Sequence, residues 1–264
     1  SSSHRATAND KATFAVSRAV NVFASAGWES IDYGAGNRSI HDMTWSVGGN
    51  WTPNEDSRIS LSYGHQEGAD SIQGDGYYAL SARTSISGSY SSMIGTQLDN
   101  LQRQLNNAAV GNTGTLVNGQ DGLPLFGPTN ALGVQNGVFR TNTLSMSIQT
   151  TIERDSLSLS LSHSTQTSMQ TQGGSSTVGK TLSLTWSHAL NPNLSFNSSA
   201  QFSVQHSSGS AADTTSIYAN ASLQYMLSET ISTSLRYSFF DRNGTTALTK
   251  TYASTLILGA SKAF

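Results

Sequence analysis

The most regular feature of the chain is a strict alternation of apolar and polar residues over short segments. Residues 156–162 alternate serine with leucine, and related patterns occupy 12–16, 22–28, 43–51, 59–63, 78–82, 86–90, 144–148, 182–187, 194–205, 217–225, 231–239 and 252–260. A period of two is that of a β-strand, whose successive side chains point to opposite faces of a sheet. The pattern therefore predicts about thirteen strands, each with one apolar and one polar face.

The segments between these strands are of two kinds that alternate along the chain. Short turns are expected at 53–56, 153–155, 191–193 and 228–230, and longer Gly/Ser-rich loops at 34–39, 67–75, 172–177, 208–214 and 241–250. Tight turns at one rim and long loops at the other are typical of outer-membrane barrels. We therefore predict one all-β domain over 1–264, an antiparallel transmembrane β-barrel with short periplasmic turns and long extracellular loops. Bacterial barrels have an even strand number, so we expect either that at least one N-terminal strand is missing, with 14–16 strands in the complete barrel, or that thirteen is a miscount.

One long segment, residues 94–137, interrupts the strand pattern. Thr96 and Asp99 resemble the capping box of a helix, and Leu98, Leu101 and Leu105 then fall on one helical face. A short helix near 97–108 is expected, followed by a Gly/Asn-rich loop. So short a helix is only marginally stable alone in water. We therefore expect it to dock on the barrel, as a plug inside the lumen or as a lid outside it.

The composition fits a barrel better than a soluble domain. Charged residues make up 11% of the 264 and hydrophobic residues 36%, both below the usual share of a soluble domain. There is no cysteine, so a thiolate metal site is excluded, and a net charge of −2 gives no basic footprint for nucleic acid. No metal-ligand cluster and no phosphate-binding glycine loop stands out. The sequence thus predicts no metal, no cofactor and no nucleic-acid partner, and the lipid bilayer of a Gram-negative outer membrane as its surroundings.

The polar face of the strands is the predicted lining of the lumen. It consists mainly of Ser, Thr, Asn and Gln, with few charges, and its candidates are Arg58, Ser160, Asn197, Gln201, Ser203, Asn220, Gln224 and Arg236. Ion-selective pores tend to carry rings of charge, whereas hydroxyl and amide groups offer many weak hydrogen bonds. This lining favours a neutral or weakly acidic glycan. The alternative, that small polar residues simply fill a wet lumen, has slightly more weight.

Catalysis is not expected. Six histidines are present, among them His41 beside Asp42 and His163, His188 and His206 near strand ends. Serine is so abundant that a Ser–His pairing is expected by chance, and a catalytic triad is identified by its geometry. We therefore expect rim histidines and no enzyme.

The last strand resembles the C-terminal strand of outer-membrane proteins. Such strands end in an aromatic residue, here Phe264, with hydrophobic residues such as Leu256 and Leu258 at alternate positions before it, although Lys262 departs from the pattern. The resemblance implies that the barrel-assembly machinery reads this strand.

The middle and C-terminal parts resemble the outer-membrane barrels of exosortase/PEP-CTERM-associated exopolysaccharide loci. The residues concerned are 83–91, the Gln/Leu segment 97–105, Asp121–Pro124 and Val138–Arg140, and the resemblance covers about two thirds of the chain. It implies a porin-like channel in exopolysaccharide export or surface assembly, with polysaccharide-export components as partners and no assigned catalytic residue. Two alternatives stay open, an autotransporter-type translocator and a structural or adhesive surface barrel without transport.

Overall fold

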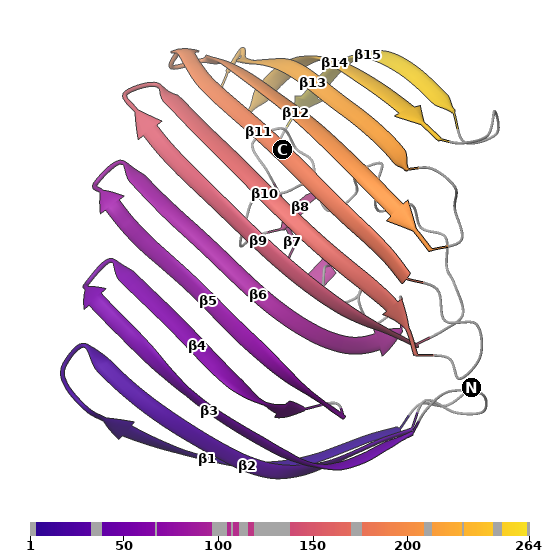
Figure 1. Cartoon of the computed structure of the whole chain (residues 1–264). Coiled ribbons are helices and arrows are strands. Elements are labelled where there is room, and N and C mark those ends of the chain that lie inside the picture. The colour runs from indigo at the N-terminus through magenta and orange to yellow at the C-terminus, as the bar shows by residue number, and fades with distance from the viewer. Residues whose placement is uncertain are drawn as a thin grey trace.

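The structure is a computed structural model, and it is dominated by one large antiparallel sheet (Figure 1). It describes residues 4–32, 39–66, 68–96, 105–106, 108–110, 116–118, 138–169, 176–208, 213–228, 230–244 and 250–262. Thirteen strands form the sheet: β1 (His4–Ala15), β2 (Val20–Asp32), β3 (Ile40–Asn54), β4 (Ser57–Gln66), β5 (Ala69–Ser81), β6 (Thr84–Thr96), β9 (Val138–Ile152), β10 (Asp155–Ser168), β11 (Ser176–Asn191), β12 (Leu194–Ser207), β13 (Thr214–Met226), β14 (Ile231–Asn243) and β15 (Thr251–Lys262).

Each strand of this sheet pairs with the strands that precede and follow it along the wall. The order is β1-β2-β3-β4-β5-β6-β9-β10-β11-β12-β13-β14-β15, and every pair is antiparallel. Turns at 55–56, 82–83, 153–154 and 192–193 join strands at one rim. The predicted all-β antiparallel fold and its thirteen strands are confirmed.

One predicted loop is wrong. Residues 67–75 were expected to form a long loop because they are rich in glycine and polar side chains. In the structure β4 ends at Gln66 and β5 begins at Ala69, so only two residues separate the strands. Residues 69–75 are paired with β4, and hydrogen bonds to that neighbour hold them extended although their own strand propensity is low.

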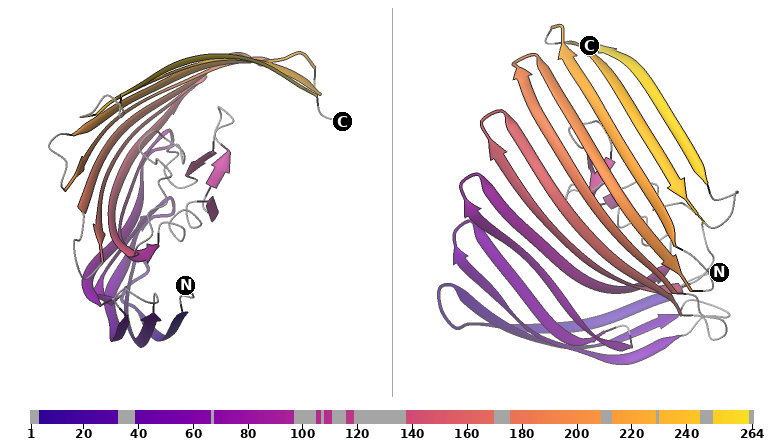
Figure 2. Two further views of the ribbon diagram at one scale, coloured as in Figure 1. Left: turned by 90° about the vertical axis from the view of Figure 1, so that its right-hand side faces the viewer. Right: turned by 45° about the horizontal axis from the view of Figure 1, so that its top comes forward.

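The sheet is strongly curved and forms a wall (Figure 2). β1 is hydrogen-bonded only to β2, and β15 only to β14, so the described strands form an open wall with two edges. The curvature follows from the right-handed twist of adjacent strands, which bends a sheet of this many strands toward a barrel.

Burial on this wall is the reverse of that in a soluble protein. The buried apolar residues of the described chain are Ile31, Ile40, Ile94, Val138 and Phe139, whereas the buried polar or charged residues are Glu29, Ser57, Ser145, Ser160, Ser183, Asn197, Gln201, Ser203, Ser216, Asn220 and Ser222. Leucines such as Leu159 and Leu184 are more than 40% exposed. A large exposed apolar face needs a lipid or protein partner.

The buried apolar residues lie near one rim of the wall, beside the tight turn between β4 and β5. Ile31 and Ile40 from β2 and β3 pack in one cluster with Ile94 and Val138 from β6 and β9, and Met169 packs against it. Gly68, at the tip of the hairpin, lies close to Ile40. The cluster connects strands on the two sides of the hairpin.

Only parts of the predicted insertion lie within the described residues. β6 runs to Thr96, so Ile94 belongs to the wall and not to the insertion. Leu105 and Asn106 are helical and exposed, whereas Leu98 and Leu101 lie outside the described residues. The expected helix over 97–108 extends too far, because β7 (Ala108–Val110) begins at Ala108 and pairs with β8 (Leu116–Asn118). Both views of Figure 2 place this small hairpin within the hollow of the wall.

No helix among the described residues is long and apolar enough to cross a membrane.

Two glycines provide a matched test of strand packing. A Cβ at Gly64 would fall on the carbonyl oxygen of Trp45 and on Ser46, whereas a Cβ at Gly88 would meet nothing closer than 3.7 Å. We expect Gly64→Ala to lower the stability of the sheet by about 1–3 kcal/mol, the usual cost of overpacking, and Gly88→Ala to change it little. The measurement is urea unfolding of both variants in detergent, and equal stabilities would contradict the register of β3 and β4.

Candidate functional site: the polar concave face

The candidate site is the polar face of the wall, and the strand register shows how it is built. Serines, amides and a tyrosine stand directly opposite one another in the row Ser87, Ser147, Ser160, Ser183, Gln201 and Tyr218, which crosses from β6 to β13. Side chains converge on the concave face of a curved sheet and spread apart on the convex face. Because the members of this row are buried or half-buried while the alternating leucines are exposed, the polar face is the concave one.

Hydrogen bonds link the polar side chains from strand to strand. Ser87 and Ser147 lie 2.6 Å apart, and Ser89 and Ser145 lie 2.7 Å apart, each pair joined through the hydroxyl oxygens. Near β12, the Ser187 hydroxyl donates to Oδ1 of Asn197 at 2.7 Å. These short side chains leave room on the concave side of the wall.

Amide groups on β13 extend the same network. Nδ2 of Asn220 donates to Oγ of Ser199 at 2.8 Å and lies 3.3 Å from the hydroxyl of Tyr218. The Ser222 hydroxyl is 3.5 Å from the carbonyl oxygen of Asn197. The network therefore joins β12 to β13 through uncharged groups.

Several polar atoms on this face have no protein partner among the described residues. They are Oγ1 of Thr141, Oγ of Ser183, Oε1 of Gln201, Oγ of Ser203, Oδ1 of Asn220 and Nε of Arg242. Buried polar groups are nearly always hydrogen-bonded, to protein or to ordered water. Four of the six lie on β11, β12 and β13, where bound water would supply the missing partners.

Charges on the concave face are few and partly neutralised. Arg58 on β4 lies 3.3 Å from a carboxylate oxygen of Asp75 on β5, and both side chains are more than half exposed. Exposed pairs of this kind add little stability, so their main effect is to reduce the net field. Lys11 on β1 lies over the ring of Phe23, 3.9 Å from its centroid.

All eight predicted lumen residues fall on the polar face by strand alternation and register. Ser160, Asn197, Gln201, Ser203 and Asn220 are at most 8% exposed, whereas Gln224 and Arg58 are exposed.

Sequence analysis did not single out Ser183, Ser216 and Ser222, although the alternation places them on the same face. Of the predicted assembly signal, Leu256 and Leu258 are exposed on β15, and Phe264 lies outside the described residues.

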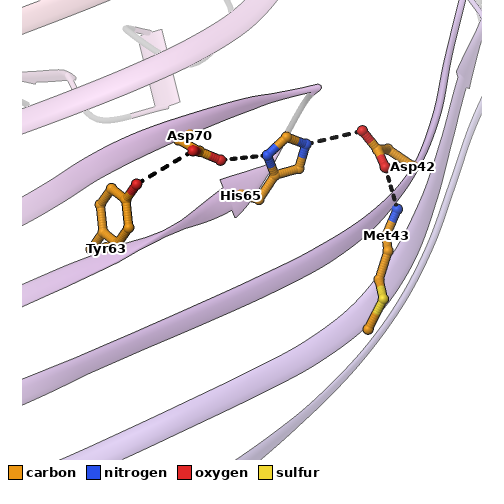
Figure 3. Close-up of polar contacts among 5 residues, drawn as sticks. All are labelled: Asp42, Met43, Tyr63, His65 and Asp70. Atoms are coloured by element: carbon orange, nitrogen blue, oxygen red, sulfur yellow. Dashed lines mark hydrogen bonds and ion pairs between the residues drawn. The ribbon is translucent and has the colours of Figure 1, made fainter.

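A second polar cluster joins β3, β4 and β5 near the long-loop rim (Figure 3). His65 lies between two carboxylates, with Nδ1 2.6 Å from Asp70 and Nε2 2.9 Å from Asp42. The backbone N–H of Met43 donates to Asp42 at 2.8 Å, and the Tyr63 hydroxyl lies 3.3 Å from Asp70. Because a carboxylate only accepts, this geometry fits an imidazolium that donates from both nitrogens. Sequence analysis missed the cluster, since only the register brings these residues together.

The other histidines do not assemble a catalytic triad in the described part of the chain. Ser30 Oγ lies 2.8 Å from Nδ1 of His41, but the contacts of that ring include no carboxylate. His188 pairs with Asp155 and His206 with Asp213, each at 2.7 Å. The described residues also contain no group of three or more His, Cys, Asp or Glu side chains able to hold a metal ion.

The class of protein follows from these features together. An antiparallel sheet of thirteen strands joined in sequence order, with an exposed apolar face and a buried polar face, is the wall of a transmembrane β-barrel of the outer-membrane type.

The chain is similar to several known proteins in structure, without a match in sequence. No protein-family model matches the chain, and no curated protein matches it. Among solved structures it is similar to a loop L8 deletion mutant of OmpT, an outer membrane protein of Vibrio cholerae (9% identity, 97% of this chain and 89% of that chain covered, TM-score 0.49). It is also similar to an anion-selective porin from Comamonas acidovorans (10% identity, 98% and 89% covered, TM-score 0.47) and to OccAB1 from Acinetobacter baumannii (12% identity, 98% and 69% covered, TM-score 0.42).

Proposed function

We propose that this chain forms the wall of a passive, non-enzymatic channel in the outer membrane of a Gram-negative bacterium. The observation that carries the proposal is the reversed burial. The described wall turns leucines such as Leu159, Leu161 and Leu184 outward, and turns serines and amides inward. Lipid stabilises the first face and water the second.

The chemistry of the concave face favours uncharged, hydrogen-bonding solutes. Asn197, Gln201 and Asn220 supply amide donors and acceptors, and the surrounding serines supply hydroxyls. A face with these groups and few charges binds weakly at many places, which suits a sugar chain that has to slide. We therefore propose neutral or weakly acidic glycans as the solute, and an exopolysaccharide as the specific candidate on the basis of the family resemblance.

The β7–β8 hairpin supports the further proposal that the insertion narrows the lumen. It lies within the hollow of the wall, on the polar side (Figure 2). A barrel of this strand number leaves a water-filled interior unless something occupies it. A constriction formed by the insertion would act on this side of the wall.

The test is solute entry into liposomes that contain the folded protein. We expect neutral oligosaccharides to enter and the reversal potential in a KCl gradient to be close to zero. Gln224→Glu adds a carboxylate to an exposed position on the concave face of β13 without a change of shape, and this variant should become more permeable to K⁺ than to Cl⁻.

Asn54→Asp is the matched control, because Asn54 lies at the β3–β4 turn, where its Oδ1 accepts a backbone hydrogen bond from Asp56 that aspartate preserves. This control should leave selectivity unchanged. If liposomes with correctly folded protein exclude both sugars and salts, the channel proposal is wrong. If the β13 variant conducts with unaltered selectivity, Gln224 does not line the conducting path.

A further inference from the structure

The apolar convex face has one position where two bases stand side by side. His163 on β10 and Lys180 on β11 are direct cross-strand partners. Both follow the alternation of the outward leucines, because His163 is two residues after Leu161 and Lys180 two residues before Leu182. They therefore end an apolar column on the convex face.

This pair lacks a counter-charge in the part of the protein that the structure describes. Among the described residues, neither His163 nor Lys180 has a hydrogen bond or an ion pair, whereas His65, His188 and His206 each contact an aspartate. Two bases directly opposite each other in a sheet repel when both are charged. An anion between them would remove that repulsion and gain two charge-assisted hydrogen bonds.

The surroundings indicate the kind of anion. Leu144 on β9 pairs with His163, and Leu161 pairs with Leu182 immediately below the two bases. All three leucines are at least 40% exposed on the convex face. A ligand that fits both the two bases and the neighbouring leucines has an anionic head beside His163 and Lys180 and acyl chains along the leucines.

The depth of the pair agrees with such a ligand. β10 ends at Ser168 and β11 begins at Ser176, and these two strand ends lie at the rim opposite the tight turns at 153–154 and 192–193. His163 and Lys180 are thus near the edge of the apolar band, at the level where lipid headgroups begin.

We propose that His163 and Lys180 bind the phosphate group of an anionic membrane lipid, whose acyl chains lie on Leu144, Leu161 and Leu182. The inference rests on the proposed membrane location but not on transport, so a failed transport assay would leave it standing. Charge complementarity commits the site to a lipid phosphate, because a free anion gains nothing from the leucine column.

The experiment compares the thermal unfolding of the folded protein in three kinds of vesicle. These are phosphatidylcholine alone, phosphatidylcholine with added phosphatidic acid, and phosphatidylcholine with inorganic phosphate in the buffer. Unfolding is followed by the mobility of unboiled samples on a detergent gel. We expect phosphatidic acid to raise the Tm of the wild type and inorganic phosphate to leave it unchanged.

Two variants and a control identify the site. His163→Gln with Lys180→Gln should fold and conduct normally but lose the rise in Tm, and Lys180→Arg should retain it. Lys11→Gln is the control, because Lys11 contacts the Phe23 ring on the concave face. A wild type that phosphatidic acid does not stabilise, a double variant that keeps the full rise, or an equal rise with inorganic phosphate would each overturn the proposal. Failure of the wild type to insert into any vesicle would instead overturn the proposed function.

Discussion

Leu159→Arg is expected to destabilise the inserted protein by about 2–4 kcal/mol, the cost of an arginine on the lipid face of a barrel at the bilayer midplane. Leu159 lies in the middle of β10, directly opposite Ile148 on β9 and Leu184 on β11, in a continuous outward-facing apolar row. No acceptor in the hydrocarbon can pair with a guanidinium at that depth. The measurement is the free energy of unfolding in phospholipid vesicles, obtained by urea titration.

The control for this variant is Ser158→Arg, one residue away on the same strand. Ser158 points to the concave face, where it stands opposite Gln149 and Thr185 and where water can solvate an added charge. We expect the Ser158 variant to stay within about 0.5 kcal/mol of wild type, as surface substitutions usually do. Ser160 and Ser203 are poorer controls, because at 5% and 1% exposure they leave little space for an arginine. If both variants lose the same stability, the assignment of the two faces is wrong.

Removal of residues 97–135 is expected to raise single-channel conductance about two-fold or more, because a barrel of this strand number is otherwise water-filled. The described β7–β8 hairpin of this segment lies inside the hollow of the wall (Figure 2). β6 and β9 pair with each other along their whole length without the insertion, so a short Gly/Ser linker should preserve the wall. The measurement is conductance in planar bilayers.

A second deletion tests whether shortening any connection at this rim raises the conductance. Residues 245–249 connect β14 to β15 at the same rim, and their replacement by a short linker should leave conductance unchanged. Unaltered conductance in the 97–135 deletion, with the wall correctly folded, would refute the constriction and favour a contact surface outside the pore.

The sequence predicted the strands well where local pattern alone decides the structure. In β10 the alternation of Leu157, Leu159 and Leu161 with serines, and in β12 that of Phe202 and Val204 with polar residues, marks the strand, and both strands are found where this alternation placed them. The first half of β5 failed this test, because Asp70, Gly74 and Asp75 have low strand propensity and are held extended by β4. Local pattern cannot show which neighbour will supply hydrogen bonds.

Some residues of the candidate site could likewise be predicted from local pattern, and others could not. Alternation alone assigned Ser160, Gln201 and Asn220 to the polar face. Successive side chains of a strand point to opposite faces of the sheet, so the apolar neighbours of these residues fix the face on which they lie. The Asp42–His65–Asp70 cluster and the Arg58–Asp75 pair depend on the register between strands, which follows from turn length and pairing and not from local pattern. The predicted loop at 67–75 concealed the short β4–β5 connection that creates both.

The direction of the two edge strands limits how the wall can close into a barrel. Strand direction reverses at every step of the sheet, and thirteen is an odd number, so β1 and β15 run the same way across the membrane. Joined directly, they would form one parallel seam in an otherwise antiparallel barrel. A second copy inserted in the same orientation offers only edges of that same direction, so a barrel closed by two copies would contain two parallel seams. A seam of antiparallel hydrogen bonds requires an odd number of additional strands, the outermost of which run from the short-turn rim toward the long loops. Disulfide crosslinking of cysteines introduced on β1 and β15 would therefore report a parallel register if the wall closes on itself, and no crosslink if other strands lie between them.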